Sequence, residues 1–258
     1  MNGPVELDFG DLGWALGMIG MCAVLSRLSR LDLEGQFLLA AGRSILQLLV
    51  VGYILAIVFE LDNPLAVLGI VGVMMAIAAV VAKNRIDRRD KGLFPLVFGS
   101  LLVSSTLTLG YTIALIVQPE RWYSPQYLIP LTGMVLGNAM NSASLAGERL
   151  TGSIERNHLE IETRLCLGAD PRQSIETYRR EAIRASLIPT LNQMMVVGLV
   201  SLPGMFTGQV LAGIDPLNAA SYQILILFAI ALANLLTALF VTEGVYRRFF
   251  NANWQLKK

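Results

Sequence analysis

The run Ala219–Tyr246, AASYQILILFAIALANLLTALFVTEGVY, has a single charged residue, Glu243, in 28 positions. An apolar stretch of about 20 residues is long enough to cross the hydrocarbon core of a bilayer as a helix. Of the 258 residues, 54% are hydrophobic and 15% are charged, whereas about 25% of an average soluble protein is charged. The sequence therefore predicts an all-α, polytopic membrane protein with a single transmembrane domain over residues 1–258.

Similar apolar runs recur along the chain and predict about seven transmembrane helices. The segment before the first run lacks basic residues, so this run is expected to be a retained span and not a cleavable signal peptide. The longest polar interval, residues 147–186, follows the fifth run. The predicted spans are Leu12–Leu28, Phe37–Phe59, Pro64–Ala82, Leu93–Val117, Tyr127–Ala146, Leu187–Leu202 and Ala219–Tyr246.

Lys and Arg residues are divided unequally between the two sides of this layout. The connections after the odd-numbered spans carry 18 of the 20 basic residues, and the other connections carry only Arg121. The remaining cation, Arg43, lies inside the second span. Because cytoplasmic loops are enriched in Lys and Arg, the N-terminus is predicted outside, and the C-terminus and the 147–186 loop are predicted in the cytoplasm.

The 147–186 loop predicts two short amphipathic helices joined at a sharp corner. Gly152–Gly168 has helical periodicity, and Gly168 is a typical helix-ending residue with a left-handed backbone. Asp170-Pro171-Arg172-Gln173 then has the pattern of an N-cap, a proline at the first helical position and a capping-box glutamine. The first face runs through Ile154, His158, Ile161 and Leu165, and the second through Ile175, Tyr178, Ala182 and Ile183.

This periodicity has two interpretations. A corner with such well-defined helix ends suits a surface that docks rigidly onto a partner protein. A pair of interfacial helices lying on the lipid headgroups explains the same pattern equally well.

The corner segment Glu162–Ala169, ETRLCLGA, resembles the "EAA" coupling loop of ABC-transporter permeases, although Thr163 and Arg164 replace its usual alanines. Longer runs resemble the FetB-type iron-export permease family, which is related to plant aluminium-tolerance permeases. These runs are Gly133–Met140 (GMVLGNAM), Ala185–Thr190 (ASLIPT), Val197–Gly208 (VGLVSLPGMFTG), Ala212–Pro216 (AGIDP) and Tyr222–Ile224 (YQI).

The resemblance implies a permease subunit of a bacterial inner (plasma) membrane exporter of iron or another metal, working with a separate ABC ATPase. The sequence contains no G-x-x-x-x-G-K-[ST] phosphate loop, so we expect no enzymatic activity and no cofactor in this chain, with ATP and Mg²⁺ bound by the partner. We expect a homodimer in contact with membrane lipid, and no nucleic-acid partner. The residues expected to couple to the ATPase are Glu162, Leu165, Gly168, Ala169, Asp170 and Pro171.

Two other functions remain open. Because of the plant relatives of the family, a non-metal metabolite such as a nucleotide sugar is an alternative cargo. A secondary transporter working alone is the third possibility, although ion coupling usually requires acidic residues within the spans.

Polar residues within the spans are candidates for a substrate path. Arg43 is one because an intramembrane cation is often functional, although it lies near enough to the cytoplasmic side to snorkel. Asn138, Asn141 and Ser142 are expected on one face of the fifth span, for packing or for substrate contact. The full set of candidates is Arg43, Gln47, Asn138, Asn141, Asn192 and Gln193.

Small residues and prolines predict helix packing and helix interruption. Two G-x-x-x-G patterns, Gly133/Gly137 and Gly204/Gly208, allow close helix contact, and Pro189 and Pro203 suggest a kinked or interrupted sixth span. No metal ligand is assigned. Met194, Met195 and Met205 are soft ligands by chemistry, but methionines at helical spacing are more often core residues.

Overall fold

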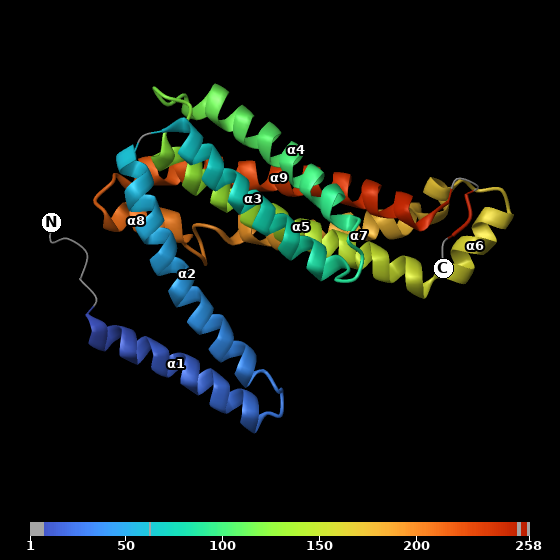
Figure 1. Ribbon diagram of the computed structural model, residues 1–258, viewed down its shortest axis with the longest axis horizontal. Coiled ribbons are helices and arrows are strands. Elements are labelled where there is room, and N and C mark those ends of the chain that lie inside the picture. Colours follow the sequence, from blue (N-terminus) through green and yellow to red (C-terminus); the bar gives the residue numbers. More distant parts are fainter. Residues whose placement is uncertain (1–7, 62, 252–253, 257–258) are drawn as a thin grey trace. The chain divides into compact units, whose positions relative to one another are not determined.

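The computed structural model describes residues 8–61, 63–251 and 254–256, which are almost entirely helical (Figure 1). The described residues form no strand, and only isolated β-bridges join Val197 to Ser201 and Phe250 to Leu256. The chain divides into two compact units. Unit 1 comprises residues 1–63 and 211–213, and unit 2 comprises residues 64–210 and 214–258.

Unit 1 is a helical hairpin of α1 (Phe9–Leu28) and α2 (Glu34–Leu61), which pack against each other. The hydroxyl of the buried Ser26 closes the connection by accepting the Leu33 N–H at 3.0 Å. Most of the large apolar side chains of both helices face outward, as expected for helices solvated by lipid. The first two predicted spans are therefore confirmed as apolar helices.

Unit 2 is a helical bundle with α5 (Pro125–Arg156) at its centre. This helix packs against α3 (Pro64–Ile86), α4 (Leu93–Tyr111), α7 (Pro171–Val196) and α9 (Pro216–Phe249) (Figure 1). Two glycines allow neighbouring helices to pack closely at positions that the sequence did not predict. A Cβ atom at Gly147 would overlap Ile86 of α3, and one at Gly244 would overlap Leu96 of α4.

Four of the described helices are long and apolar enough to cross a membrane, and Gly13–Leu28 is a shorter apolar helix. The four are Glu34–Glu60, Pro64–Ile86, Leu93–Val117 and Pro216–Phe249. The third includes η1 (Thr112–Val117), a π-helical continuation of α4 that ends at Gln118 in a left-handed conformation. Because α5 and α7 are too polar to be recognised as spans by themselves, the count of seven stays a prediction.

The predicted sixth span, Leu187–Leu202, is not one helix. α7 continues through Pro189 and ends at Val196, and a turn over residues 197–203 separates it from α8 (Gly204–Leu211). Val197 is extended and Gly198 has φ +81°, so the backbone leaves the helix at these two residues. The interruption therefore lies at Val197–Pro203 and not at Pro189.

The boundary between the fifth span and the predicted first cytoplasmic helix is also different. α5 continues past Ala146 to Arg156, and the predicted helix Gly152–Gly168 is divided at Asn157. Asn157 leaves the helical conformation and its side-chain amide donates to the Ser153 carbonyl at 2.8 Å. A separate helix, α6 (His158–Cys166), follows, and His158 is exposed instead of lying on the buried face.

Hydrogen bonds made by buried polar side chains tie three helices to α9. Ser142 of α5 donates to the Asn234 carbonyl at 3.0 Å, and the Asn234 amide donates to the Thr190 hydroxyl of α7 at 2.7 Å. The hydroxyls of Ser104 in α4 and Thr237 in α9 are 2.6 Å apart. Lipid offers these buried groups no hydrogen bonds, so pairing across helices stabilises them, although the Oδ1 atom of Asn234 has no partner among the described residues.

Thr190→Val removes the acceptor of the Asn234 amide while keeping the shape of the side chain. Interhelical hydrogen bonds in membrane proteins stabilise by about 1 kcal/mol, so we expect a comparable loss of unfolding free energy. Unfolding of the purified chain in mixed micelles by sodium dodecyl sulfate would measure the loss. Thr207→Val is the matched control, because the Thr207 hydroxyl bonds only to the nearby Pro203 and Gly204 carbonyls. Equal midpoints for both variants would contradict the assigned role.

Candidate functional site

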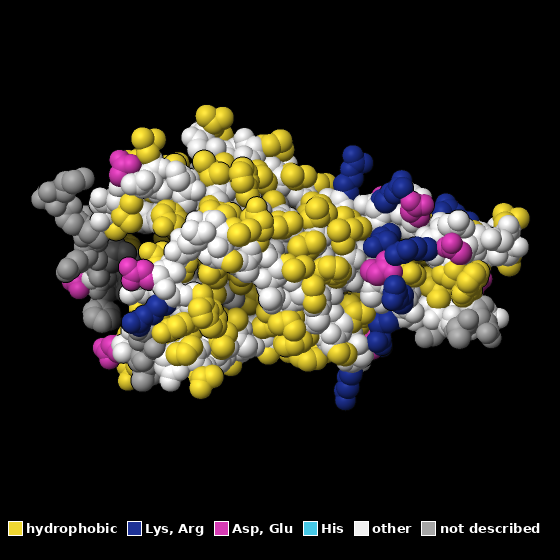
Figure 2. Space-filling model, turned by 90° about the horizontal axis from the view of Figure 1, so that it is seen from above, with side chains coloured by type: hydrophobic (Ala, Val, Ile, Leu, Met, Phe, Trp, Pro, Cys, Tyr) yellow, Lys and Arg dark blue, Asp and Glu magenta, His cyan; other side chains and the backbone are white. Residues whose placement is uncertain are grey.

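The charged side chains of unit 2 gather towards one end of the bundle, where α3 ends and α7 begins. Figure 2 shows Lys and Arg side chains concentrated towards the end that carries α6, beyond a broad hydrophobic face. Arg248 at the end of α9 forms a bidentate ion pair with Asp90 in the α3–α4 connection, at 2.7 and 2.9 Å. The basic connections predicted after the third, fifth and seventh spans therefore meet at one end.

Glu243 is the centre of an ion-pair cluster at this end. Its carboxylate lies 2.9 Å from Arg172, 3.1 Å from Arg179 and 2.8 Å from Arg247. Arg247 follows Glu243 by four residues, so this pair lies within about one helical turn of α9. The other two partners belong to α7, far away in the sequence, so helical spacing alone could not identify them. The cluster joins the beginning of α7 to the end of α9.

Two complete capping motifs form the corner between α6 and α7. At the end of α6, the Gly168 N–H donates to the Leu165 carbonyl and the Ala169 N–H to the Arg164 carbonyl, both at 3.0 Å. This is a Schellman motif, and Gly168 has the φ of +94° that it requires.

The beginning of α7 is capped in the predicted way. Asp170 accepts the Gln173 N–H at 2.7 Å, and the Gln173 side chain accepts the Asp170 N–H at 3.0 Å. Pro171 occupies the first turn. The predicted corner geometry is thus confirmed at Gly168, Asp170, Pro171 and Gln173.

The helices on either side of the corner, α6 and α7, are held together by buried apolar contacts and by polar side-chain contacts. Ile161 of α6 and Ile175 of α7 are fully buried in the same core cluster. Tyr178 donates to Glu160 at 2.7 Å, and Arg164 binds Glu160 at 2.6 Å while lying 5.9 Å from the Tyr178 ring centroid. The Tyr178 hydrogen bond, with Arg164 assisting, lowers the pKa of Glu160, and burial together with Glu160 raises the pKa of Tyr178.

The tip of the corner exposes an apolar side chain. Leu167 is 83% exposed, and Glu162 and Gly168 are also on the surface, while Leu159, in the first turn of α6, is 68% exposed. Leu165 instead packs against the core cluster that includes Val241 and Val245 of α9. A constrained turn with a protruding leucine is suited to contact with another protein, and Leu165 connects its inner side to the bundle.

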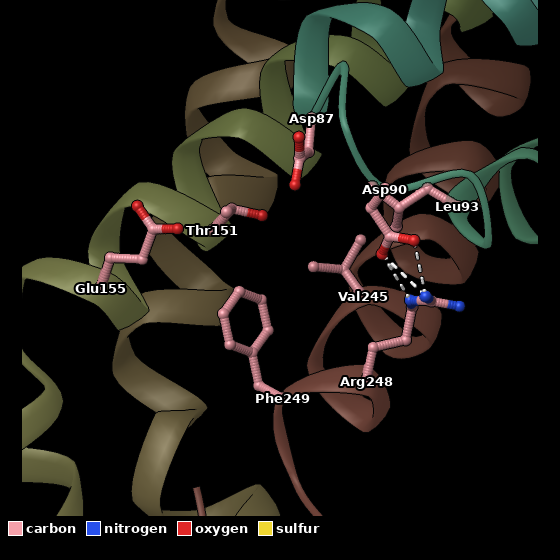
Figure 3. A pocket seen from close by; sticks show the side chains of 8 residues that line it. All are labelled: Asp87, Asp90, Leu93, Thr151, Glu155, Val245, Arg248 and Phe249. Carbon is pink, nitrogen blue, oxygen red and sulfur yellow. Dashed lines mark hydrogen bonds and ion pairs between the residues drawn. The ribbon is translucent and has the colours of Figure 1, made fainter. Parts of the chain in front are cut away.

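A pocket of about 380 Å³ lies near the same end (Figure 3). Its three carboxylates do not form a free acidic cluster, since Asp90 pairs with Arg248 and Asp87 accepts the Arg89 N–H at 2.7 Å. Among the described residues, no group of three His, Cys, Asp or Glu residues is arranged to hold a metal ion. The lining residues are Asp87, Asp90, Leu93, Thr151, Glu155, Val245, Arg248 and Phe249.

The candidate substrate-path residues are distributed over α2 of unit 1 and over α5 and α7 of unit 2. Arg43 and Gln47 are exposed on α2 in unit 1, and Asn192 and Gln193 are exposed on α7. On α5, the Asn138 amide donates to the Met134 carbonyl of its own helix at 2.9 Å.

The predicted common face of Asn138, Asn141 and Ser142 is divided. Asn141 is exposed, whereas Ser142 is buried against α9. Consecutive residues such as Asn141 and Ser142 point about 100° apart around a helix. The edge of the buried face of α5 therefore lies between them.

The glycines of the two G-x-x-x-G patterns have different surroundings. Gly133 faces α3, where an added Cβ would lie 3.3 Å from the Met74 methyl. An added Cβ at Gly137, Gly204 or Gly208 would meet nothing within 4 Å. Neither pattern therefore forms a complete packing seam within the described part of the chain.

The three candidate methionines also lie in different environments. Met195 is 69% exposed and Met194 is half-buried, both on α7. Met205 of α8 packs against a core cluster that includes Leu131 and Ile226.

Comparison with known proteins identifies the family of the chain. The model described as "Uncharacterised protein family (UPF0014)" matches residues 9–250. UPF0014 membrane protein slr1647 of Synechocystis is 62% identical over 252 residues, covering 98% of this chain and 97% of that protein. No solved structure matches significantly.

Two further relatives from other organisms have names of their own, one of them that of a permease. The probable iron export permease protein FetB of Escherichia coli is 35% identical over 95% of this chain and 93% of its own length. Protein ALUMINUM SENSITIVE 3 of Arabidopsis thaliana is 32% identical over 94% of this chain and 88% of its own. The resemblance seen in the sequence is therefore confirmed, and the chain belongs to the UPF0014 family of membrane proteins.

Proposed function

We propose that this chain is the membrane permease subunit of an ABC-type exporter whose ATPase is a separate polypeptide. The observation that carries the proposal is the doubly capped corner between α6 and α7, with Leu167 protruding from it. Its sequence, Glu162–Ala169, resembles the coupling loop with which ABC permeases contact their ATPases. In this role, Glu162, Leu167 and Gly168 face the ATPase, and Leu165, Ala169, Asp170 and Pro171 maintain the corner.

The structure offers a mechanical path from this corner into the bundle. Leu165 and the buried Ile161 and Ile175 contact the core, and the Glu243 cluster joins α7 to α9. A displacement of the corner by the ATPase would therefore move α7 directly and α9 through these contacts. The chain itself needs only to change conformation, while ATP and Mg²⁺ act on the partner.

The proposed cargo is iron or another metal ion. The support for this cargo is the 35% identity to a probable iron export permease over nearly the whole length of both proteins. Cargo-binding residues are not assigned. We place the protein in the inner (plasma) membrane, with seven spans, an external N-terminus and a cytoplasmic α6–α7 corner.

The chain is further proposed to act as a homodimer with a contact on α5. Gly137 leaves open space beside the helix, and Asn141 is exposed without a hydrogen-bond partner among the described residues. An amide at mid-helix is better satisfied by another helix than by lipid. In a twofold-symmetric dimer, the Gly137 and Asn141 face of a second copy supplies such a partner. ABC transporters require two membrane halves, which this dimer would provide.

The orientation is tested by the exposed thiol of Cys166 on α6. In a Cys22→Ser background, Cys166 should react with a membrane-impermeant maleimide only after the cells are permeabilised. Asn218→Cys, at the opposite end of unit 2 and tested with Cys166 replaced by Ser, should react in intact cells. Labelling of Cys166 in intact cells would overturn the orientation.

The dimer contact is tested by Gly137→Leu. The bulky side chain should separate the α5 helices and reduce the dimer fraction, measured by single-molecule photobleaching of labelled chains in vesicles. Gly72→Leu is the control, since a Cβ at Gly72 on α3 also meets nothing within 4 Å. A monomeric wild-type chain in the active complex would remove the dimer proposal.

The coupling corner is tested by Gly168→Val. A β-branched residue resists φ +94°, so the Schellman motif should be lost while the membrane bundle stays intact. We expect the variant to reach normal membrane abundance but to lose most of its ATPase copurification and ATP-driven export.

Gly168→Asn is the matched control, because asparagine tolerates the left-handed conformation better than other side chains. It should retain most ATPase binding and transport. If Gly168→Val binds the ATPase and transports normally, the α6–α7 corner would instead be a connector that lies on the lipid headgroups.

A further inference from the structure

A second pocket, of about 290 Å³, lies at the end of unit 2 opposite the charged corner. One wall is the turn that interrupts the helix after Val196 and includes Leu202, and Phe206 of α8 lies beside it. The other wall is the first part of α9, including Ala220 and Leu227. All its lining residues are uncharged, and one of them, Gln223, carries a polar side chain.

Gln223 is an unexplained polar group in this apolar setting. The residue is only 7% exposed, and its Oε1 atom is buried without a hydrogen-bond partner among the described residues. A buried amide that lacks a partner is costly, especially in a membrane protein. Rotation of the terminal torsion exchanges Oε1 and Nε2, so the amide can accept from a hydroxyl or donate to a carbonyl.

The depth of Gln223 in the bilayer indicates what it meets, given the membrane placement proposed above. Twenty residues of α9 separate it from Glu243, which corresponds to about 30 Å along a helix. This length equals the thickness of the hydrocarbon core. With the Glu243 ion cluster at the cytoplasmic boundary, Gln223 lies at the outer boundary, where the acyl chains of lipids join their headgroups.

The mouth of the pocket has the character of a lipid-facing surface. Leu199 and Val200, in the same turn as the pocket residue Gly198, are 89% and 85% exposed. The absence of a charged residue from the lining disfavours an ionic ligand inside the pocket. We propose that the pocket binds a membrane lipid of the outer leaflet, with an acyl chain against the apolar walls and an ester carbonyl or hydroxyl hydrogen-bonded to the Gln223 amide.

The site is tested with the full chain in lipid nanodiscs that contain a phosphatidylglycerol with a diazirine near the ester end of one acyl chain. After illumination, labelled peptides are identified by mass spectrometry. We expect labelling to concentrate in residues 197–206 and 220–227 and to fall when unlabelled diacyl lipid is added. Gln223→Leu should reduce this labelling about fivefold, the effect of losing one hydrogen bond.

Two further variants make the result specific. Ala220→Trp fills the pocket without changing the amide and should abolish the labelling, whereas Gln126→Leu, exposed on α5 outside the pocket, should leave it unchanged. Labelling spread evenly over the exposed helices and unaffected by all three variants would overturn the site. Displacement of the probe by water-soluble hexanol but not by diacyl lipid would overturn lipid as the ligand. ATPase binding does not enter these measurements, so they are independent of the proposed export function.

Discussion

The enclosure of α5 is the constraint on which the rest of unit 2 depends. This helix is too polar to be recognised as a membrane span, yet it occupies the centre of the bundle. Polar side chains are tolerated at membrane depth when neighbouring helices satisfy them. α3, α4, α7 and α9 surround α5, and the bonds from Ser142 and Thr190 to Asn234 use α9 as a common partner.

The local features of the chain could be predicted from its sequence to a large extent. Apolar periodicity identified the helices, and the corner at Gly168–Gln173 follows from residue types whose conformational preferences act over a few positions. The Glu243–Arg247 pair was predictable for the same reason, since it spans one helical turn. Such features depend on neighbours in the sequence and little on the remainder of the fold.

Features that depend on distant residues could not be predicted in this way. The arginines of α7 that bind Glu243, the overlap of Gly147 with Ile86 and the pairing of Ser104 with Thr237 all require the arrangement of the bundle. The sequence suggested that the sixth span is kinked or interrupted but could not locate the interruption, because the apolar run continues through Val197–Leu202, where Gly198 changes the backbone direction. The hydrophobicity of a segment indicates whether it is surrounded by lipid or protein interior, but it does not indicate where the backbone leaves the helical conformation.

Glu243 has more cationic partners than charge balance requires. Arg172 and Arg179 are seven residues apart, about two helical turns, so they follow each other along the same side of α7. When α7 shifts along its axis relative to α9, one guanidinium can leave the carboxylate while another remains bound. Arg247 lies on α9 itself, so Glu243 would keep a counterion during such a shift, and the two helices could slide without breaking every ion pair of the cluster at once.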